Sequence, residues 1–150
     1  MTEIIIRTAT KSDYQIIKKL VKELYDTLDE KIGMVEHLPL KKFEDILNEP
    51  KIEILVADAD NKVVGYLTIN YNKSLLDVGA TAIIDELIVT KAYQKRGIGK
   101  QLVNSAIKYA TRHGCSEIGV GTESNNTLAK GFYKACGFKE IGVIFEKHLR

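Results

Sequence analysis

Residues 87–100 carry the most informative pattern in the sequence and read Leu87-Ile88-Val89-Thr90-Lys91-Ala92-Tyr93-Gln94-Lys95-Arg96-Gly97-Ile98-Gly99-Lys100. It begins as the end of an apolar strand pattern, passes through a short polar loop and enters an amphipathic helical pattern. Free backbone N–H groups at a helix start lie at the positive end of the helix dipole, and such a place binds phosphate. Gly97 and Gly99 leave these amides accessible, and the loop also carries three cations, Lys95, Arg96 and Lys100. The sequence therefore predicts a phosphate-binding loop at residues 94–100.

Elimination narrows the class of phosphate compound that this loop binds. A Walker A loop requires G-x-x-x-x-G-K-[ST], and the segment does not supply that pattern. The dinucleotide fingerprint requires a third glycine or alanine where Leu102 stands, and it normally follows the first strand. By itself, the spacing of the two glycines is equally compatible with a tight turn that has no ligand.

The segments before the loop alternate between strand and helix patterns. We expect helices from Thr10 to about Asp29, where Thr10 and Asp13 form a capping-box-like start, and over Leu40–Leu47. The expected strands are Ile4–Arg7, Ile52–Ala57, Val63–Tyr71 and Ala82–Val89. Gly65 predicts a bulge or bend in the third of these strands. Asp85 and Glu86 interrupt the otherwise apolar fourth strand.

The segments after the loop continue the alternation. Helices are expected over Gly97–His113 and Ser124–Ala135, a strand over Ser116–Gly121, and one or two last strands over Phe138–Phe145. The resulting order, β-α-α-β-β-β-α-β-α-β, predicts the α/β class (an α+β mixed sheet) with helices on both faces. No linker or repeat interrupts the chain, so residues 1–150 are expected to form a single domain.

Composition excludes several classes of function. The chain has 150 residues, of which 45% are hydrophobic and 28% charged, so disorder is excluded. Its net charge of +2 is too small to indicate a nucleic-acid partner. Cys115 and Cys136 lack the spacing of metal ligands, and no metal is expected. Because no signal-peptide pattern and no long apolar run is present, we expect no membrane partner and a cytoplasmic location.

The glycine loop and its surroundings resemble one family of enzymes. The segment Gln94-Lys95-Arg96-Gly97-Ile98-Gly99 resembles the Q/R-x-x-G-x-G/A loop of the GCN5-related N-acetyltransferase (GNAT) family. Residues 86–89 are similar to the fourth strand of that family, and residues 126–138 to its N-x-x-A-x-x-F-Y-x-x-x-G-F segment. The opening Arg7-x-Ala9-x-x-x-Asp13 is also similar. The resemblance covers nearly the whole chain in the expected order.

The resemblance implies a fold and a co-substrate. A GNAT-like fold has a mixed sheet of six to seven strands and about four helices, with a bulge that separates the fourth strand from the fifth. The chain would be an acetyl-CoA-dependent N-acetyltransferase. The backbone of Leu87, Ile88 and Val89 would bind the pantetheine arm, and the pyrophosphate would be held by Gln94, Lys95, Arg96, Gly97, Ile98, Gly99 and Lys100. Asn126 would fix the pantetheine end or the helix on which it lies, unless it is only a helix cap.

The resemblance also implies catalytic roles for Tyr133 and for an acid on the fourth strand. Acetyl transfer leaves a thiolate whose parent thiol has a pKa of about 8.5, and the Tyr133 phenol can donate a proton to it. The alternative is that Tyr133 only packs on Phe138. Glu86 and Asp85 are candidate bases for the acceptor ammonium, directly or through a water; the alternative is that they form an ordinary salt bridge. Strand alternation places them on opposite faces unless the bulge intervenes. The amine would attack the thioester directly in a ternary complex.

The acceptor is less well specified. In the family, residues corresponding to Tyr25–Leu38 and roughly Gly142–His148 set acceptor specificity. The first of these stretches contains four acids, Asp26, Asp29, Glu30 and Glu36. They favour a small cationic metabolite or drug-like amine. A protein lysine or N-terminal acetyltransferase and a non-catalytic acyl-CoA-binding module remain alternatives, and the sequence leaves a homodimer open.

Overall fold

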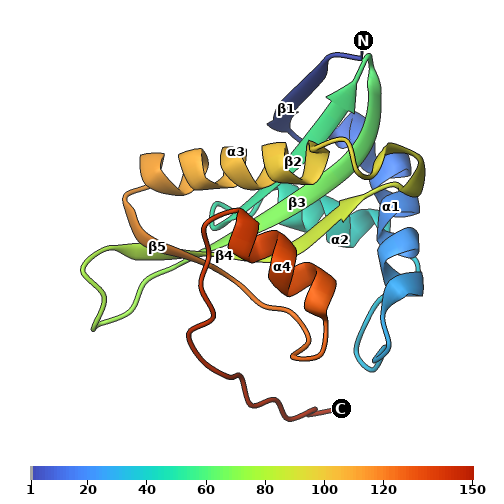
Figure 1. The fold of residues 1–150 in the computed structure, drawn as a ribbon. Coiled ribbons are helices and arrows are strands. Elements are labelled where there is room, and N and C mark those ends of the chain that lie inside the picture. The colour runs from blue at the N-terminus through green and yellow to red at the C-terminus, as the bar shows by residue number, and fades with distance from the viewer. Residues whose placement is uncertain (1) are drawn as a thin grey trace.

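The computed structural model describes residues 2–150 and consists of one five-stranded sheet with four α-helices (Figure 1). The strands lie in the order β1 (Ile4–Thr8), β2 (Ile52–Ala59), β3 (Lys62–Asn72), β4 (Ala80–Val89) and β5 (Cys115–Val120). The α-helices are α1 (Tyr14–Thr27), α2 (Leu40–Leu47), α3 (Ile98–Arg112) and α4 (Thr127–Ala135). Two short 3₁₀ helices are η1 (Lys11–Asp13) and η2 (Lys91–Tyr93). The first four strands are antiparallel, whereas β5 runs parallel to β4, so the predicted mixed sheet is confirmed.

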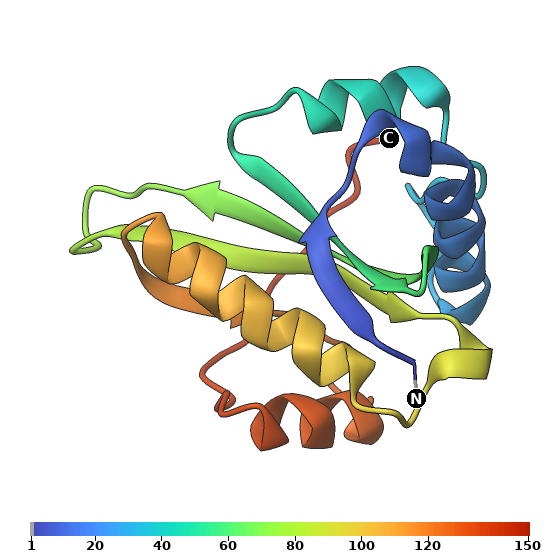
Figure 2. The same cartoon turned by 90° about the horizontal axis from the view of Figure 1, so that it is seen from above.

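The sheet has a hydrophobic core on each face, and Figure 2 shows the helices that cover the two faces. Leu102 and Val103 of α3 pack with Leu67 of β3 on one face. On the other face, Leu20 of α1 and Phe43 of α2 pack against the sheet. Helices α1, α2 and α3 each bury apolar residues against the sheet, and the expectation of helices on both faces is confirmed. Within residues 2–150, no helix combines the length and apolar character that a membrane crossing requires.

The sheet contains a bulge beside Gly65. The pairing of β2 with β3 shifts at Ala57 and Asp58, which pair with Gly65 and Val63 respectively. A Cβ atom on Gly65 would lie 2.7 Å from the carbonyl oxygen of Ile88 on β4. The bend predicted at this glycine is therefore present, and close approach of the neighbouring strand explains why no side chain fits there.

The N-terminal segment is held by ion pairs around Arg7. Its guanidinium donates to both carboxylate oxygens of Asp13, at 2.9 and 3.0 Å, and to Asp58 of β2 at 3.2 Å. Asp13 also accepts the backbone N–H of Thr10 at 2.8 Å, which confirms the predicted helix start. The first turn is nevertheless a 3₁₀ helix, and α1 ends at Thr27, not near Asp29. Hydrogen bonding from Arg7 lowers the pKa of Asp13 despite its burial.

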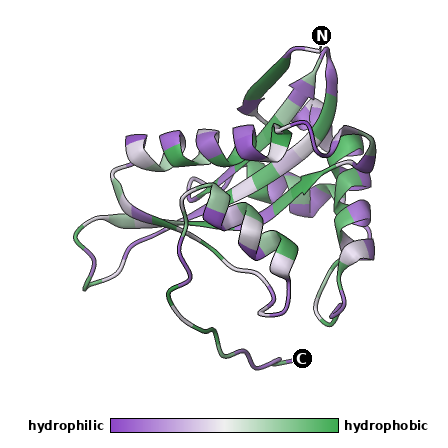
Figure 3. Cartoon of the chain, in the orientation of Figure 1, coloured by the Kyte–Doolittle hydropathy of each residue, from purple (hydrophilic) through white to green (hydrophobic). Residues whose placement is uncertain are grey.

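The last predicted strands are wrong. Residues 138–150 have no regular secondary structure, and the sheet has five strands, not six or seven. We call residues 139–150 the C-terminal tail; it follows α4 (Figures 1 and 3) and passes the end of β5, where a Cβ atom on Gly121 would lie 4.0 Å from Ile144. A strand forms only when its backbone pairs with a neighbour, and the tail has none among residues 2–150. The preceding helix also begins later than predicted, at Thr127 and not at Ser124.

Candidate active site at the end of strand β4

Strands β4 and β5 pair over only half the length of β4. Their register runs from Ala80 opposite Cys115 to Ile84 opposite Val120. Strand β4 continues to Val89, and on its β5 side residues 85–89 pair with no other strand in the described structure. A free strand edge offers backbone donors and acceptors to an extended ligand, which then binds as an added strand.

The divergence begins at a bulge. Glu86 pairs with Thr68 and Ile84 with Ile69, so Asp85 is an extra residue in β4. Before the bulge, Ala82 and Ile84 belong to the core under α3; after it, Leu87 and Val89 pack against that core, while Ile88 belongs to the opposite one. The alternation therefore reverses between residues 84 and 87. Asp85 and Glu86 are both exposed to solvent, and simple alternation does not separate them.

Glu86 has an unusual environment for a carboxylate. Thr68 donates a hydrogen bond to its Oε1 atom at 3.4 Å. Among residues 2–150, no lysine, arginine or histidine side chain forms an ion pair with Glu86. Desolvation by the surrounding protein, followed by the negative charge of Asp85, raises the pKa of Glu86, while Thr68 and Tyr66 oppose this rise. Tyr66 is 1% exposed; its hydroxyl is near enough to Glu86 to lower the pKa of that carboxyl, but it makes no hydrogen bond of ordinary geometry within residues 2–150. Sequence reasoning missed Tyr66 and Thr68 because both read as ordinary strand residues.

The loop between η2 and α3 presents free amides. In residues 2–150, none of the six backbone N–H groups from residue 95 to residue 100 donates a hydrogen bond to a protein acceptor. Lys95 and Gly97 both have left-handed backbone conformations, with φ of 63° and 79°. The side chain of Gln94 donates to the Val89 carbonyl at 2.8 Å and ties the loop to β4. Arg96 lies over the Tyr93 ring at 4.9 Å. Free amides and cations at the start of a helix form an anion site.

The two glycines of the loop have different reasons to be glycine. Gly97 is left-handed and has no atom near the position of a Cβ, so backbone conformation restricts it. A Cβ on Gly99 would lie 3.4 Å from the Phe132 ring of α4. For Gly99, the structure thus gives helix packing as a reason, whereas the sequence reasoning had invoked only ligand access.

Helix α1 contacts the start of the loop through Glu23. Its carboxylate accepts the Thr90 hydroxyl at 2.9 Å and the Lys91 N–H at 3.0 Å. These bonds join the helix on the α1–α2 face to the end of β4. Sequence reasoning missed Glu23, since nothing local in a polar helix face indicates a partner 67 residues away.

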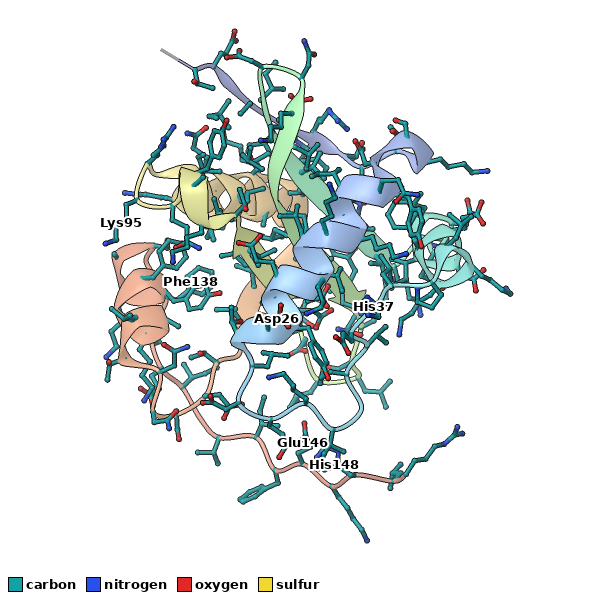
Figure 4. All side chains as sticks on the ribbon, turned by 90° about the vertical axis from the view of Figure 1, so that its right-hand side faces the viewer. Asp26, His37, Lys95, Phe138, Glu146 and His148 are labelled. Atoms are coloured by element: carbon teal, nitrogen blue, oxygen red, sulfur yellow. The ribbon has the colours of Figure 1, made fainter. Side chains whose placement is uncertain are left out.

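Helix α4 carries the two remaining candidates, Asn126 and Tyr133. Asn126 caps the helix, because its Oδ1 accepts the Ala129 N–H at 3.0 Å. Tyr133 is partly buried, and its ring makes edge contacts with Phe132 and Phe138. Burial, followed by the nearby Cys136, raises the pKa of Tyr133. Figure 4 shows Phe138 beside α4 and Lys95 at the tip of the loop.

The acids of the α1–α2 connection are largely engaged. Asp26 accepts Lys22 at 2.6 Å, and Glu36 lies 3.6 Å from the same ammonium. Glu30 accepts the Ile32 N–H at 3.1 Å. These contacts weaken the argument that the four acids form one cation-binding surface. The other predicted acceptor segment, Gly142–His148, lies in the tail, where Glu146 and His148 are labelled in Figure 4.

A model of the acetyltransferase (GNAT) family matches residues 16–138. The chain is 24% identical over 138 residues to an aminoglycoside N(6')-acetyltransferase type 1 of Salmonella enteritidis, covering 90% of this chain and 91% of that protein. It is 27% identical over 121 residues to an N-alpha-acetyltransferase of Sulfurisphaera tokodaii, covering 76% and 72% respectively.

Solved structures share the fold. A crystal form of aminoglycoside N-acetyltransferase AAC(6')-Iy in complex with CoA superposes with a TM-score of 0.82 at 22% identity. The superposition covers 100% of this chain and 97% of that one.

Proposed function

Because the chain belongs to the acetyltransferase (GNAT) family and is an acetyl-CoA-dependent N-acetyltransferase, we propose that it acetylates a small primary amine by direct attack in a ternary complex. Residues 1–150 act as a single catalytic domain in this proposal. The observation that carries it is the row of free amides at residues 95–100, next to a strand edge that has no partner. A diphosphate and a peptide-like arm are the chemical groups that fit these two features.

The cofactor would extend from the loop to β4. The amides at residues 95–100 would bind the pyrophosphate, and Lys95, Arg96 and Lys100 would add positive charge. The free edge at Leu87, Ile88 and Val89 would hydrogen-bond the pantetheine arm. Gln94 and Asn126 would act structurally, because their side chains already bind the Val89 carbonyl and the Ala129 N–H.

Glu86 would be the general base. An acceptor amine with a pKa near 10.4 is protonated at neutral pH and must lose a proton before it attacks. A carboxylate with a raised pKa accepts that proton better than an ordinary one. Desolvation by the surrounding protein and the charge of Asp85 raise the pKa of Glu86, so Asp85 would assist without contacting the proton.

Tyr133 would be the general acid. It lies on α4, whose Phe132 ring is so close to the start of α3 that a Cβ atom on Gly99 would lie 3.4 Å from it. The departing thiolate would take its proton from the phenol. The raised pKa of Tyr133 keeps the phenol protonated until the thiolate forms.

The acceptor would be a small amine. An aminoglycoside acetyltransferase is among the relatives that match nearly the whole chain. The exposed pair Asp85 and Glu86, which has no cation partner in residues 2–150, supplies negative charge for an ammonium group. The N-alpha-acetyltransferase relative favours the second candidate, a protein N-terminus.

Two glycine variants test the cofactor loop. Gly97→Asp adds a negative charge beside the free amides, and Gly114→Asp is its matched control at the other end of α3. Gly114 also has a left-handed backbone, with φ of 74°, and open space around it. Saturating acetyl-CoA should raise the melting temperature of the wild type and of Gly114→Asp by mass action. Gly97→Asp should lose most of that rise; an unchanged rise would refute the loop assignment.

Turnover distinguishes the proposed acceptors. The enzyme with acetyl-CoA and a panel of amines should release free CoA with small amines, and Tyr133→Phe should slow this release while keeping the thermal response. Acetylation of N-terminal peptides alone would favour the second candidate. Thermal stabilisation without any turnover would indicate a binding module.

A further inference from the structure

Glu23 is the residue through which the second half of α1 bonds to the end of β4. Its Oε2 atom accepts the Thr90 hydroxyl at 2.9 Å, and its Oε1 atom accepts the Lys91 N–H at 3.0 Å. We call Thr90 and Lys91 the β4 corner; they lie between Val89, where β4 ends, and the cofactor loop. Figures 1 and 2 show this corner beside α1. The two bonds therefore connect a helix to the strand end that the proposed cofactor follows.

The second half of α1, residues 21–27, has few other attachments. The fully buried residues of the helix, Ile17 and Leu20, both lie in its first half. The second half packs on the same core only through partly buried side chains. In residues 2–150, no hydrogen bond or ion pair besides those of Glu23 joins this half to the sheet or to the cofactor loop. Its position relative to β4 therefore depends strongly on one carboxylate.

Glu86, the proposed general base, lies on the same side of the sheet as α1. Ile88, two residues after Glu86 on β4, belongs to the core of the α1–α2 face. Side chains two residues apart on a strand share a face. Tyr66, whose hydroxyl lowers the pKa of Glu86, belongs to that core as well. The acceptor amine would therefore reach Glu86 from the α1 side, a step that rests on the proposed function.

Lys22, the residue before Glu23, holds the segment that follows α1. Its ammonium lies 3.6 Å from Glu36, in the connection between α1 and α2, and 2.6 Å from Asp26. Adjacent residues of the helix thus bond to that connection and to the β4 corner. A shift of this half of α1 would change the acceptor side of the site and its distance from the cofactor side together.

We propose that Glu23 is a positioning residue that couples acceptor binding to cofactor binding. Its carboxylate sets the position of the second half of α1 relative to the end of β4, and the acceptor site lies between these two elements. A cofactor bound along β4 and the loop orders the β4 corner, and Glu23 transmits that order to the acceptor side. CoA and the acceptor each increase the affinity for the other, because coupling between two sites is reciprocal. Glu23 acts through the corner and not by contact with a substrate.

Hydrogen exchange of the ligand-free full chain tests the contact itself. The Lys91 N–H has no acceptor besides Glu23 in residues 2–150, so it should exchange at least about tenfold faster in Glu23→Ala than in the wild type. Glu44→Ala is the matched control, because it removes a carboxylate from α2 whose ion pair with Lys11 is 4.0 Å long. It should leave the Lys91 amide unchanged. Equal exchange in the wild type and in Glu23→Ala would overturn the proposal.

Titration calorimetry measures the coupling. The Kd of the amine that the panel shows to be acetylated fastest is measured without and with saturating CoA, which has no acetyl group to transfer. In the wild type, CoA should lower this Kd by at least about fivefold. In Glu23→Ala the ratio should fall below about twofold, whereas Glu44→Ala should keep the wild-type ratio. A ratio near one in the wild type, or an equal ratio in Glu23→Ala, would overturn the proposal.

Two milder variants keep the test valid if Glu23→Ala folds poorly. Glu23→Gln has an amide oxygen that can accept one of the two bonds, and it should give an intermediate ratio. Thr90→Val removes only the hydroxyl and should also reduce the ratio, with no further loss when it is combined with Glu23→Ala. Additive losses would show that Glu23 does not act through the β4 corner.

The two measurements separate failure of this proposal from failure of the proposed function. If no amine is acetylated, the proposed function and the coupling both fall, while the exchange of the Lys91 amide still reports the contact. If amines are acetylated but the ratio is the same in the wild type and in Glu23→Ala, the coupling alone is wrong.

Discussion

Two regions of this molecule place carboxylates close together, and the carboxylate pKa is shifted in opposite directions in the two regions. Around Arg7, the guanidinium lies between Asp13 and Asp58, and hydrogen bonding from Arg7 lowers the pKa of Asp13. At the β4 bulge, Asp85 and Glu86 are neighbours without a cation partner in residues 2–150, and the pKa of Glu86 is raised. The first arrangement favours the ionised form, whereas the second disfavours it.

The difference separates a structural site from a reactive one. A carboxylate that is held by a guanidinium is a weak base, because protonation would break its ion pair. A carboxylate that is desolvated beside another negative charge gains from taking up a proton. Proteins keep such unfavourable groups where function needs them.

The largest expected effect is on catalysis. Glu86→Gln should lower kcat by about 10²–10⁴-fold, because a general base contributes by about that factor. Asp58→Asn, the matched change in the Arg7 region, should alter kcat by less than about threefold. Steady-state kinetics with one acceptor amine measures both. If Asp85→Asn is inactive while Glu86→Gln is active, the base is Asp85.

The next effect is on stability and belongs to the Arg7 region. Asp13→Asn should lower the free energy of unfolding by about 2 kcal/mol, since it breaks an ion pair in which the Asp13 side chain is 7% exposed and that of Arg7 is 35% exposed. Because the pKa of Asp13 is lowered in the folded state, its contribution is present above the ordinary value of 3.8 and is lost as the pH falls. The free energies of unfolding of the wild type and of Asp13→Asn, measured by urea denaturation, should therefore become equal at acidic pH. A constant difference at every pH would contradict the ion-pair explanation.

A smaller effect of opposite sign is expected at Glu86. A raised folded pKa means that the protonated carboxyl stabilises the fold below the ordinary value of 4.5, and that this contribution is lost as the pH rises through the raised value. Glu86→Gln should therefore stabilise the protein at pH 7, by less than about 1 kcal/mol because water reaches the side chain. Thermal melts at pH 7 and pH 4 should show the gain only at the higher pH. If Glu86→Gln were less stable than the wild type at pH 7, Glu86 would have a structural role and not the role of a base.

The smallest effect concerns Thr68, whose hydroxyl donates to Glu86 and lowers its pKa. Thr68→Val removes this bond and should move the acid limb of the kcat/KM profile upward by a few tenths of a pH unit, on the order of 0.5 kcal/mol. Thr81→Val, which lies farther along the β3–β4 pairing, is the control and should leave the limb in place. An unmoved limb in Thr68→Val would mean that another group is titrating.

Much of the fold could be predicted because its signals are local. The apolar periodicity of α1 and α3 and the glycines of the loop each lie within a few residues of one another. The boundaries were less predictable: Ser124 precedes the start of α4 by three residues because the capping side chain is that of Asn126. The tail was wrongly predicted as strand. Apolar and polar residues do alternate along it, but a strand also needs a neighbouring strand to pair with, and the alternation does not show whether one is present.

The candidate site was predictable in composition but not in geometry. Gln94, Gly97 and Tyr133 could be selected from their motifs. That Asp85 is the extra residue of a bulge depends on its pairing with β3, which no spacing within β4 reveals. The contact of Glu23 with Thr90 and the position of Tyr66 beside Glu86 likewise join distant parts of the chain. The contacts that set the properties of the candidate site join residues far apart in the sequence, and local sequence motifs do not predict such contacts.

The left-handed backbone of Lys95 has a consequence for protein engineering. An L-residue with a side chain in that conformation costs about 1 kcal/mol, and the folded chain bears this cost before any cofactor arrives. A screen for heat resistance alone would favour Lys95→Gly, which relieves the strain. The same replacement would let the loop adopt many shapes and would weaken its hold on a diphosphate. At this position, selection for durability and selection for cofactor affinity act against each other.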